Sequence, residues 1–486
     1  MSGLTASGAS SLSARSPSDA VYDVAIVGAG DVGCAIAREL ARFDLRIALI
    51  EAGPDVGAGT SKANTAILHT GFDAKPGTLE ARLVARGHDL LMSYADEVGI
   101  PVERTGALLV AWSDDERERF GAIRENAERC GYDRVADIST EELYRREPHL
   151  GPGALGALAV PDEHIVCPFT PPLAYATQAV LAGVDLRRSE AVSGLERRDG
   201  RWLLETSRGR LAADWVVNAA GLRSDEVHAM AGHQGFTVTP RRGELLVYDK
   251  LARPLLRHTI LPVPTATTKG VLVAPTVFGN VMLGPTAVDV DRKDDTSSTP
   301  DGIAYLLSLV GRLVPDLARE EVTAVYVGLR AATEHGDYQL GVDGEDGYAW
   351  AGGIRSTGLT ASMAIAEHVR DELDRAGLAL RDRNGGLPSI RMPNIGEAGP
   401  RPFAQPEAIM ADSEYGHIVC FCERVTRGEI RDTAVSPVPP ADLDGLRRRT
   451  RVLMGRCQGF FCGAHVLEMF AEQSGRSPED LTELPR

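Results

Sequence analysis

Two pairs of cysteines near the C-terminus have a spacing that could bind metal. Cys420 and Cys422 form a C-x-C pair, and Cys457 and Cys462 form a C-x4-C pair further along the chain. Four thiolates can hold two irons bridged by two sulfides, whereas zinc is usually bound by a C-x2-C pair at each end of its site. The spacing therefore favours a 2Fe–2S cluster, with zinc or a metal-free core as the alternatives.

Five arginines lie just upstream of the second cysteine pair, and two interpretations of them are open. Positive charge near a thiolate-bound cluster would raise its reduction potential, because the cluster is anionic. A solvated basic face would explain the arginines equally well. The five are Arg447, Arg448, Arg449, Arg451 and Arg456.

A glycine-rich turn near the N-terminus has the pattern of a dinucleotide-binding site. Gly28, Gly30 and Gly33 form G-x-G-x-x-G between an apolar run typical of a buried parallel strand and a segment with helical spacing. Glycine is needed there because the chain turns tightly, the backbone approaches a pyrophosphate and the helix packs close to the strand. Glu51 ends the next predicted strand, where its carboxylate can accept hydrogen bonds from ribose hydroxyls.

Two later segments resemble the D-amino-acid-oxidase-like flavoprotein superfamily. N-A-A-G-L at 218–222 resembles a strand end of that superfamily, and G-G-I-R-S-T-G at 352–358 resembles its late flavin-binding turn. The resemblance implies FAD as the cofactor, with the N-terminus of the following helix stabilising the reduced, anionic flavin. Ordinary glycine turns are the alternative. Besides Gly28, Gly30, Gly33 and Glu51, the implied FAD contacts are Thr60, Ser61, Asn64, Ala220, Gly221, Gly353, Arg355, Gly358 and Leu359.

The cysteine segment has a resemblance of its own. Residues 417–423 and 455–462 resemble the bacterioferritin-associated-ferredoxin-like 2Fe–2S domain, which occurs fused to several flavin dehydrogenases. The resemblance implies that Cys420, Cys422, Cys457 and Cys462 are the cluster ligands.

Further segments resemble FAD-dependent glycerol-3-phosphate dehydrogenases, above all their anaerobic-type catalytic subunit. L-2-hydroxyglutarate oxidases share much of this similarity, particularly from His69 to Gly77. The similarity covers 21–375 and 416–466. The segments that show it are 59–83, 241–250, 269–287, 326–332 and 352–361.

Oxidation of a hydroxyl carbon by a flavin needs a base for the hydroxyl proton and cations for an anionic substrate. His69 is the candidate base by its pKa class. The resemblance places Arg330 beside the flavin and Arg355 in the late flavin turn, where each could bind phosphate or carboxylate. Lys269 is a further possible anion contact. A structural histidine, surface ion pairs and a solvated lysine are the respective alternatives.

The elements that position these residues indicate an α/β fold. Strand and helix patterns alternate near the glycine turn, 78–130 is mostly helical, and short strands broken by proline and glycine between 243 and 290 indicate an antiparallel sheet. A segment rich in proline and glycine at 384–415 predicts a linker. We expect a disordered leader (1–20), a Rossmann-like FAD-binding domain (about 21–77, 160–236 and 326–380) interleaved with an α+β substrate domain (about 78–159 and 237–325) within 21–383, the linker (384–415) and a 2Fe–2S domain (416–486).

Composition limits the partners and the compartment. The chain has 486 residues and a formal net charge of −16, which argues against binding to a nucleic-acid backbone. The first twenty residues lack the apolar stretch of a signal peptide, and no apolar run reaches the length of a membrane span. We therefore expect a cytoplasmic protein, in contact with the inner face of the membrane only through a partner.

Together these patterns predict an FAD-dependent dehydrogenase that oxidises glycerol 3-phosphate or a similar small anionic hydroxy compound. Hydride passes to FAD, and electrons leave through the cluster to an acceptor protein or a quinone-linked partner subunit. One alternative is an oxidase or dehydrogenase of L-2-hydroxyglutarate or another 2-hydroxy or amino acid, such as an opine. The other is a non-catalytic electron-transfer subunit.

Overall fold

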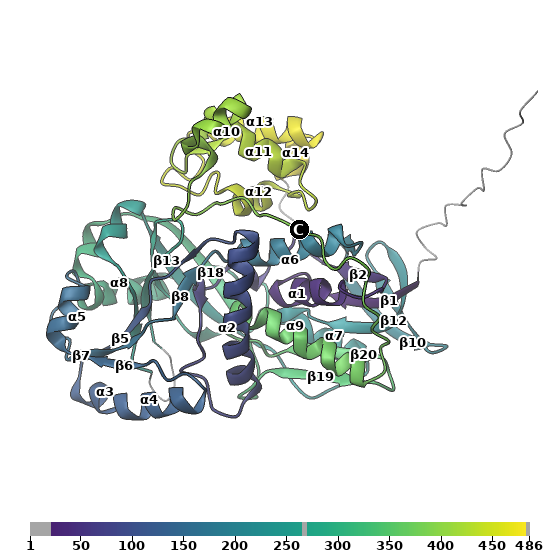
Figure 1. Ribbon diagram of the computed structural model, residues 1–486, viewed down its shortest axis with the longest axis horizontal. Helices are drawn as coiled ribbons and strands as arrows, with labels where there is room; N and C mark the ends of the chain where they lie inside the picture. Colours follow the sequence, from purple (N-terminus) through teal and green to yellow (C-terminus); the bar gives the residue numbers. More distant parts are fainter. Residues whose placement is uncertain (1–20, 265–269, 483–486) are drawn as a thin grey trace, which may run out of the picture.

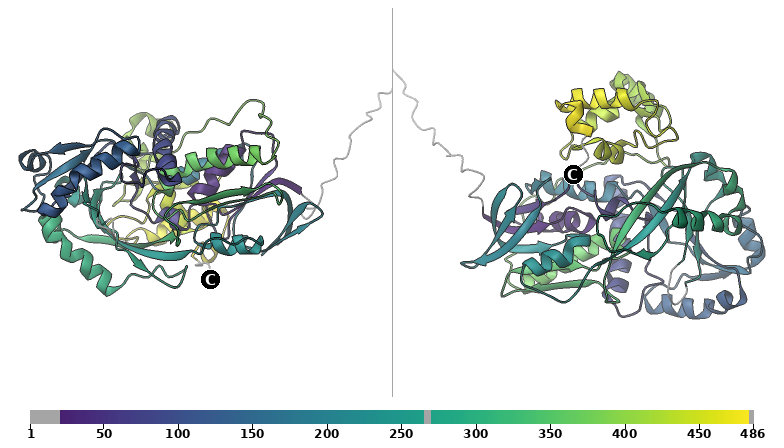
Figure 2. Two further views of the ribbon diagram at one scale, coloured as in Figure 1. Left: turned by 90° about the horizontal axis from the view of Figure 1, so that it is seen from below. Right: turned by 180° about the vertical axis from the view of Figure 1, so that it is seen from behind.

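The computed structural model describes residues 21–264 and 270–482, so the predicted leader and Lys269 lie outside the described residues. Two large sheets lie side by side, and a small C-terminal domain packs against one flank of them (Figures 1 and 2). The predicted α/β class is confirmed, as is the antiparallel sheet. No helix among the described residues is long and apolar enough to cross a membrane.

The first sheet has eight strands and a parallel centre. Its main path runs β10-β11-β12-β1-β2-β9, and β20 pairs in parallel with β12 and antiparallel with β19. All four residues of β2 are buried, as expected for a strand covered on both faces. The strands are β1 (Val21–Val27), β2 (Ile47–Ile50), β9 (Asp185–Arg187), β10 (Val192–Arg198), β11 (Arg201–Thr206), β12 (Gly209–Asn218), β19 (Gln339–Asp343) and β20 (Tyr348–Gly352).

Four helices contribute to the core on this sheet or beside it. α1 packs against both α6 and α9, and α2 packs against α9. Helix α2, at the start of the range predicted for the substrate domain, therefore adds its apolar face to the largest hydrophobic core. The helices are α1 (Asp31–Leu40), α2 (Leu79–Val98), α6 (Thr170–Leu181) and α9 (Gly358–Arg375).

The second sheet has nine strands and is antiparallel except where β14 pairs with β5. Its order is β17-β13-β16-β15-β14-β5-β7-β6, and β18 pairs along the length of β13. Its strands are β5 (Ala107–Ala111), β6 (Ala136–Ile138), β7 (Gly156–Val160), β13 (Thr239–Tyr248), β14 (Thr259–Pro262), β15 (Leu272–Pro275), β16 (Val281–Gly284), β17 (Val288–Asp289) and β18 (Val322–Ala332).

Smaller elements connect the sheets. A three-stranded sheet has the order β3-β8-β4, and α8 begins with Thr299 as its N-cap, whose hydroxyl accepts a hydrogen bond from the Gly302 N–H. These elements are β3 (Ile67–Leu68), β4 (Val102–Glu103), β8 (His164–Val166), α3 (Asp114–Glu118), α4 (Phe120–Arg129), α5 (Thr140–Arg146), α7 (Ser224–Met230) and α8 (Pro300–Leu313).

The cysteine-bearing domain has its own small core. Val425, Ile430, Leu446, Val466 and Phe470 are fully buried in it. Its helix α11 begins with a capping box between Thr426 and Glu429. The elements are β21 (Ile418–Cys420), β22 (Val425–Thr426), α11 (Arg427–Ala434), α12 (Leu443–Thr450), α13 (Gly463–Ser474) and α14 (Pro478–Thr482).

The segment predicted as a linker makes specific contacts with both parts of the protein. The Met392 N–H donates to the Val98 carbonyl at 2.7 Å, and the Glu397 N–H donates to the Val277 carbonyl in the turn between β15 and β16 at 2.8 Å. Further along, the buried Arg401 donates to the Glu423 carbonyl and to the Glu429 carboxylate of the small domain. A short helix, α10 (Pro406–Ala411), follows.

A buried carboxylate joins the small domain to the first sheet. Asp55, in the loop after β2, is fully buried and accepts hydrogen bonds at 2.8 Å from both Arg448 and Arg449 of α12. Arg188, after β9, contacts the same carboxylate at 3.3 Å. Burial alone would raise the pKa of Asp55, but the arginines, Arg449 foremost, outweigh burial and hold the pKa below its ordinary value.

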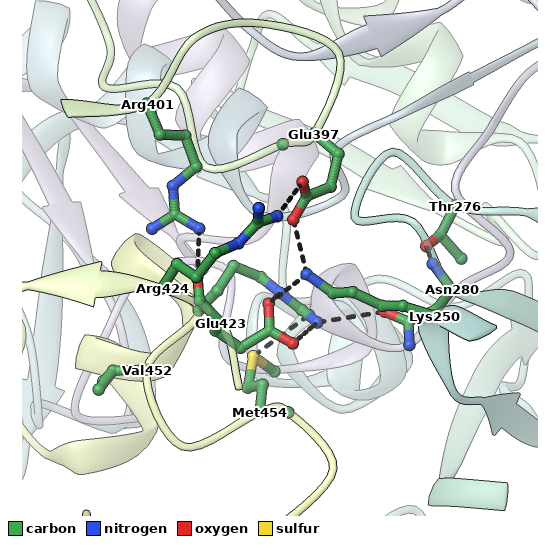
Figure 3. Close-up of polar contacts among 12 residues, drawn as sticks. Lys250, Thr276, Asn280, Glu397, Arg401, Glu423, Arg424, Val452 and Met454 are labelled. Atoms are coloured by element: carbon green, nitrogen blue, oxygen red, sulfur yellow. Dashed lines mark hydrogen bonds and ion pairs between the residues drawn. The ribbon is translucent and has the colours of Figure 1, made fainter. Parts of the chain in front are cut away.

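A second set of charges joins the small domain to the other sheet (Figure 3). Lys250 lies between two carboxylates, 2.6 Å from Glu397 and 3.1 Å from Glu423. Arg424 pairs with Glu397 at 2.6 Å. The Arg451 guanidinium, buried in the same interface, stacks on the ring of Phe278 at 4.1 Å.

The five arginines near the second cysteine pair are explained fully neither by an effect on the reduction potential of the cluster nor by a solvated basic face. Arg448, Arg449 and Arg451 are buried, so they are not a solvated face. Their charges are directed at carboxylates and an aromatic ring of the interface. Their main structural role is therefore to hold the small domain against both sheets.

We predict that Asp55→Asn destabilises this interface. Removing the anion leaves Arg449 buried without a carboxylate partner and leaves Arg448 only the partly exposed carboxylate of Asp444. Breaking a buried ion pair in this way typically costs about 3–5 kcal/mol. The variant should show a lower thermal midpoint for the small domain and faster proteolysis within 384–415. The control is Asp214→Asn, which removes a half-exposed ion pair with Arg201 far along the first sheet and should change stability by less than about 1 kcal/mol.

The same interface should be insensitive to pH in the neutral range. Because the pKa of folded Asp55 lies below its unfolded value, its contribution is fully present above the unfolded value of about 3.9 and is lost only as pH falls below it. Proteolysis rates of wild type should thus match at pH 5 and pH 8. Equal stability of wild type and Asp55→Asn would contradict the assigned role of Asp55.

Candidate active site and iron–sulfur centre

The glycine turn packs too closely for any side chain at two of its positions. A Cβ on Gly33 would lie 1.8 Å from the Gly28 carbonyl oxygen, and one on Gly28 would lie 2.4 Å from the Ala219 carbonyl oxygen. Gly28 also has φ of +105°, which favours glycine. These two glycines let α1 approach β1 and β12, while Gly30 borders a cavity.

Glu51 stabilises the turn from the end of β2. One carboxylate oxygen accepts the Ala29 N–H at 2.7 Å, and the other accepts the Gly53 N–H at the same distance. Burial raises the pKa of Glu51, while these two backbone donors lower it. Each oxygen has a second lone pair, so the carboxylate can still accept from ribose hydroxyls.

The loop after Glu51 crosses the second sheet and brings the two halves of the site together. A Cβ on Gly328 of β18 would lie 2.0 Å from the Ala63 carbonyl oxygen, so glycine permits this crossing. The Thr60 hydroxyl donates to the Leu329 carbonyl, and the Tyr326 hydroxyl donates to the Asn64 carbonyl. Ser61 accepts the Asp31 N–H at the start of α1.

One cavity of about 570 Å³ lies where these elements meet. Its size is within the usual range of about 300–1,000 Å³ for cofactor and ligand sites. It brings together the following candidates for FAD contact: Gly30, Thr60, Ser61, Asn64, Gly221, Gly353, Arg355, Gly358 and Leu359. Gly28, Gly33, Glu51 and Ala220 lie behind this surface, in or next to the turns that shape it.

The chemistry of the cavity wall fits a dinucleotide. Helices α1 and α9 both begin there, and neither N-cap residue, Gly30 or Thr357, caps its helix with a side chain; Ser61 accepts only the first N–H of α1. Uncapped N–H groups and the positive end of a helix favour anionic groups such as a pyrophosphate or a reduced flavin. At the start of α1, Asp31 has a buried carboxylate oxygen without a hydrogen-bond partner among the described residues. Burial raises the pKa of Asp31 to about 7.

Arg330 places a partly buried positive charge in this cavity. Its guanidinium donates to the Thr286 carbonyl at 3.3 Å, but no carboxylate among the described residues pairs with it. Burial, and secondarily the charge of Arg241, lowers its pKa to about 10, so it remains protonated at neutral pH. A cation held partly out of water without an anion is unfavourable, which makes this position suited to an anionic ligand.

Arg241 and Arg355 also line the cavity, with their charges partly engaged. Arg241 forms a two-point ion pair with Asp289, and Arg355 donates to the Gly336 carbonyl with Glu80 at 3.6 Å. The sequence did not single out Arg241, because arginines in a strand pattern are common on sheet surfaces.

His69 lies on the same cavity, on a segment held by α9. Its backbone N–H donates to the Thr360 hydroxyl at 3.0 Å. Its ring Nδ1 lies 3.2 Å from a carboxylate oxygen of Glu163, which is 1% exposed. Glu163 was not predicted as a site residue, since a single acid between two strands gives no motif. The structure thus brings His69, Arg330 and Arg355 together, while Lys269 lies outside the described residues.

The four C-terminal cysteines form two contacting pairs. The Cys420 and Cys462 thiols contact each other, as do the Cys422 and Cys457 thiols. Among the described residues, no three of these sulfur atoms lie within 4.8 Å of one another. A single zinc ion would hold all four sulfurs at about 2.3 Å from one centre, whereas two bridged irons separate the pairs. The arrangement therefore fits a two-iron cluster.

The loop between the second pair of cysteines is shaped to stabilise thiolate. The backbone N–H groups of Phe461, Gly459 and Phe460 donate to the Cys457 sulfur and lower its pKa. Gln458 and Gly459 have positive φ, the conformation in which successive N–H groups converge on an anion. Burial and the neighbouring sulfur of Cys420 raise the pKa of Cys462 to about 12, so bound iron must compensate the charge of the thiolates.

Comparison with known families agrees with both sites. Residues 23–372 match the family described as FAD dependent oxidoreductase, and residues 418–472 match the BFD-like [2Fe-2S] binding domain. The two matches cover the glycine turn and all four candidate ligand cysteines. They support FAD and a 2Fe–2S cluster as the cofactors of this chain.

Individual relatives and one solved structure are similar over different shares of the chain. A glycerol 3-phosphate dehydrogenase of Caloramator mitchellensis is 35% identical over 94% of this chain and 95% of its own length. An L-2-hydroxyglutarate dehydrogenase of Caenorhabditis elegans is 30% identical, but over only 57% of this chain and 66% of its own. The L-alpha-glycerophosphate oxidase of Mycoplasma pneumoniae, solved with FAD bound, has a TM-score of 0.73 and 27% identity over 77% of this chain and all of its own. The chain belongs to the FAD-dependent oxidoreductase family, with a BFD-like 2Fe–2S domain near its C-terminus.

Proposed function

We propose that this enzyme oxidises the secondary hydroxyl of glycerol 3-phosphate and forms dihydroxyacetone phosphate. The observation that carries the proposal is Arg330, a partly buried cation in the cavity that no carboxylate of the described residues neutralises. The phosphate of the substrate would supply that anion. The full-length similarity to a glycerol 3-phosphate dehydrogenase supports the same substrate.

We assign the residues of the cavity different roles according to their chemistry. Arg330, with Arg355 and Lys269 as further candidates, binds and orients the phosphate. His69 accepts the proton of the substrate hydroxyl, since a neutral imidazole is a suitable base near neutral pH. When bound, FAD supplies a two-electron hydride acceptor and the 2Fe–2S cluster supplies a one-electron carrier.

We further propose the boundaries of the parts that hold these groups. The oxidoreductase occupies 21–383, with the FAD contacts predicted above, and the iron–sulfur domain occupies 416–486 with Cys420, Cys422, Cys457 and Cys462 as ligands. The electron acceptor is a separate protein or a quinone-linked subunit, which would bring the enzyme to the inner face of the membrane.

One experiment decides between substrates. Under anaerobic conditions, glycerol 3-phosphate should bleach the flavin absorbance near 450 nm faster and at lower concentration than L-2-hydroxyglutarate. L-2-hydroxyglutarate is a candidate because arginine also binds carboxylates. The chain is also similar over part of its length to an L-2-hydroxyglutarate dehydrogenase. A preference for L-2-hydroxyglutarate would overturn the proposed substrate. No bleaching by any hydroxy or amino acid would favour a non-catalytic electron-transfer subunit.

We predict that Arg330→Ala weakens substrate binding without loss of FAD. KM for glycerol 3-phosphate should rise, and kcat/KM should fall at least tenfold, equivalent to about 1.4 kcal/mol. The control is Arg292→Ala, which removes an exposed arginine paired with Asp294 and should leave kinetics unchanged. Wild-type kinetics in Arg330→Ala would show that Arg241 or Arg355 holds the anion instead.

We predict that Cys457→Ser separates the two half-reactions. The EPR signal of the cluster should disappear and turnover with the acceptor should slow, while reduction of the flavin by substrate stays close to wild type. Cys130→Ser, at a half-buried cysteine outside the cluster, serves as the control. The measurement requires soluble, FAD-replete protein, because cluster ligation helps a small domain to fold. Loss of flavin reduction in such a sample would contradict the proposed order, in which the substrate reduces FAD before electrons reach the cluster.

A further inference from the structure

Glu163 lies in the turn between β7 and β8, and its two carboxylate oxygens have different surroundings. Oε1 accepts two hydrogen bonds from Thr70, one from the backbone N–H at 2.6 Å and one from the hydroxyl at 2.9 Å. The side chain is 1% exposed. Thr70 therefore fixes the carboxylate in one orientation through one oxygen only.

The second oxygen is directed at His69. Oε2 lies 3.2 Å from the ring Nδ1, is inaccessible to solvent and accepts no well-aligned hydrogen bond within the described part of the chain. A buried acceptor without a donor costs about 1–3 kcal/mol, more when it is charged. A small rotation of the imidazole that turns Nδ1–H toward Oε2 removes this cost, so the carboxylate favours the tautomer with its proton on Nδ1.

We propose that Glu163 is the positioning residue of His69. It holds the proton on Nδ1 and thereby makes Nε2 the atom that accepts the hydroxyl proton of the substrate. The substrate O–H bond breaks, the Nε2–H bond forms, and the nearby carboxylate stabilises the positive charge that the ring acquires. This role rests on the proposed function, because it assigns His69 as the base of that reaction.

The two anchors of the pair come from different elements. Thr360 of α9 accepts the backbone N–H of His69, and Glu163 contacts the ring from the β7–β8 turn. The ring is thus held on the cavity wall from two sides. The arrangement follows a general rule of acid–base catalysis, in which a buried carboxylate selects the tautomer and orientation of a catalytic histidine.

The decisive variant is Glu163→Gln, because it keeps the shape of the side chain and replaces one hydrogen-bond acceptor, Oε2, by a donor. The glutamine oxygen can still accept both hydrogen bonds from Thr70. Its NH₂ group then occupies the position of Oε2 and donates to Nδ1, which places the ring proton on Nε2. Flavin reduction by saturating glycerol 3-phosphate should slow at least about a hundredfold, as for other histidines held in the wrong tautomer. FAD content and the substrate dissociation constant should stay within about twofold of wild type.

A second readout follows the histidine itself. In FAD-loaded protein labelled with ¹⁵N-histidine, the His69 signals should show the proton on Nδ1 in wild type and on Nε2 in Glu163→Gln, with His69→Gln used for assignment. An unchanged tautomer, or an unchanged rate of flavin reduction, would overturn the proposal. If glycerol 3-phosphate fails to reduce even the wild-type flavin, the proposed function fails, and the tautomer still reports on the role of Glu163.

A matched control separates positioning from anchoring of the segment. Thr70→Val removes the hydroxyl that donates to Oε1 and leaves the backbone donor and the carboxylate in place. We expect a loss of less than tenfold and an unchanged tautomer. Equal losses in Thr70→Val and Glu163→Gln would assign the effect to packing and overturn the proposal. Partial recovery of the Nδ1 tautomer in Glu163→Asp would support it.

Discussion

The placement of the two redox sites depends on one buried carboxylate, Asp55. It lies in the loop that leaves Glu51 and leads to Thr60, and two arginines of α12 donate to it from the iron–sulfur domain. The loop that shapes the dinucleotide site is therefore also the docking surface of the cluster domain. Since a buried anion without these arginines would be strongly unfavourable, the two sites are held in one arrangement rather than joined by a free tether.

The cavity depends on a second constraint, the close approach of backbones. Gly33 permits α1 to lie on the β1 turn, and Gly328 permits the loop before Asn64 to cross β18. Because of that crossing, His69 lies on the same cavity wall as Arg330, although the two residues are far apart in the sequence. The N-terminal ends of α1 and α9, whose N-cap residues supply no side-chain cap, provide anion-binding N–H groups, and Arg330 provides the charge at the substrate end.

Local patterns in the sequence were sufficient for much of this structure. The glycine turn lies between a strand and a helix as predicted, and the antiparallel sheet and the cysteine pairs are also present. What could not be predicted depends on contacts between distant residues. Asp55 and Arg449 are 394 positions apart, and Glu163 is 94 positions from His69, so no motif joins either pair. The arginines near the cysteines were open to two interpretations because burial, which decides their role, is a property of the folded chain.

The most direct test of the account is the time course of cluster reduction in a single anaerobic turnover. FAD-replete, cluster-replete protein is mixed with glycerol 3-phosphate without any acceptor and frozen at intervals, and the reduced cluster is followed by EPR. Because the cluster domain is docked on the flavin-binding loop, the cluster signal should appear with a rate constant that does not change with protein concentration. A rate that rises in proportion to protein concentration, or a flavin that is reduced while the cluster stays oxidised, would contradict the account.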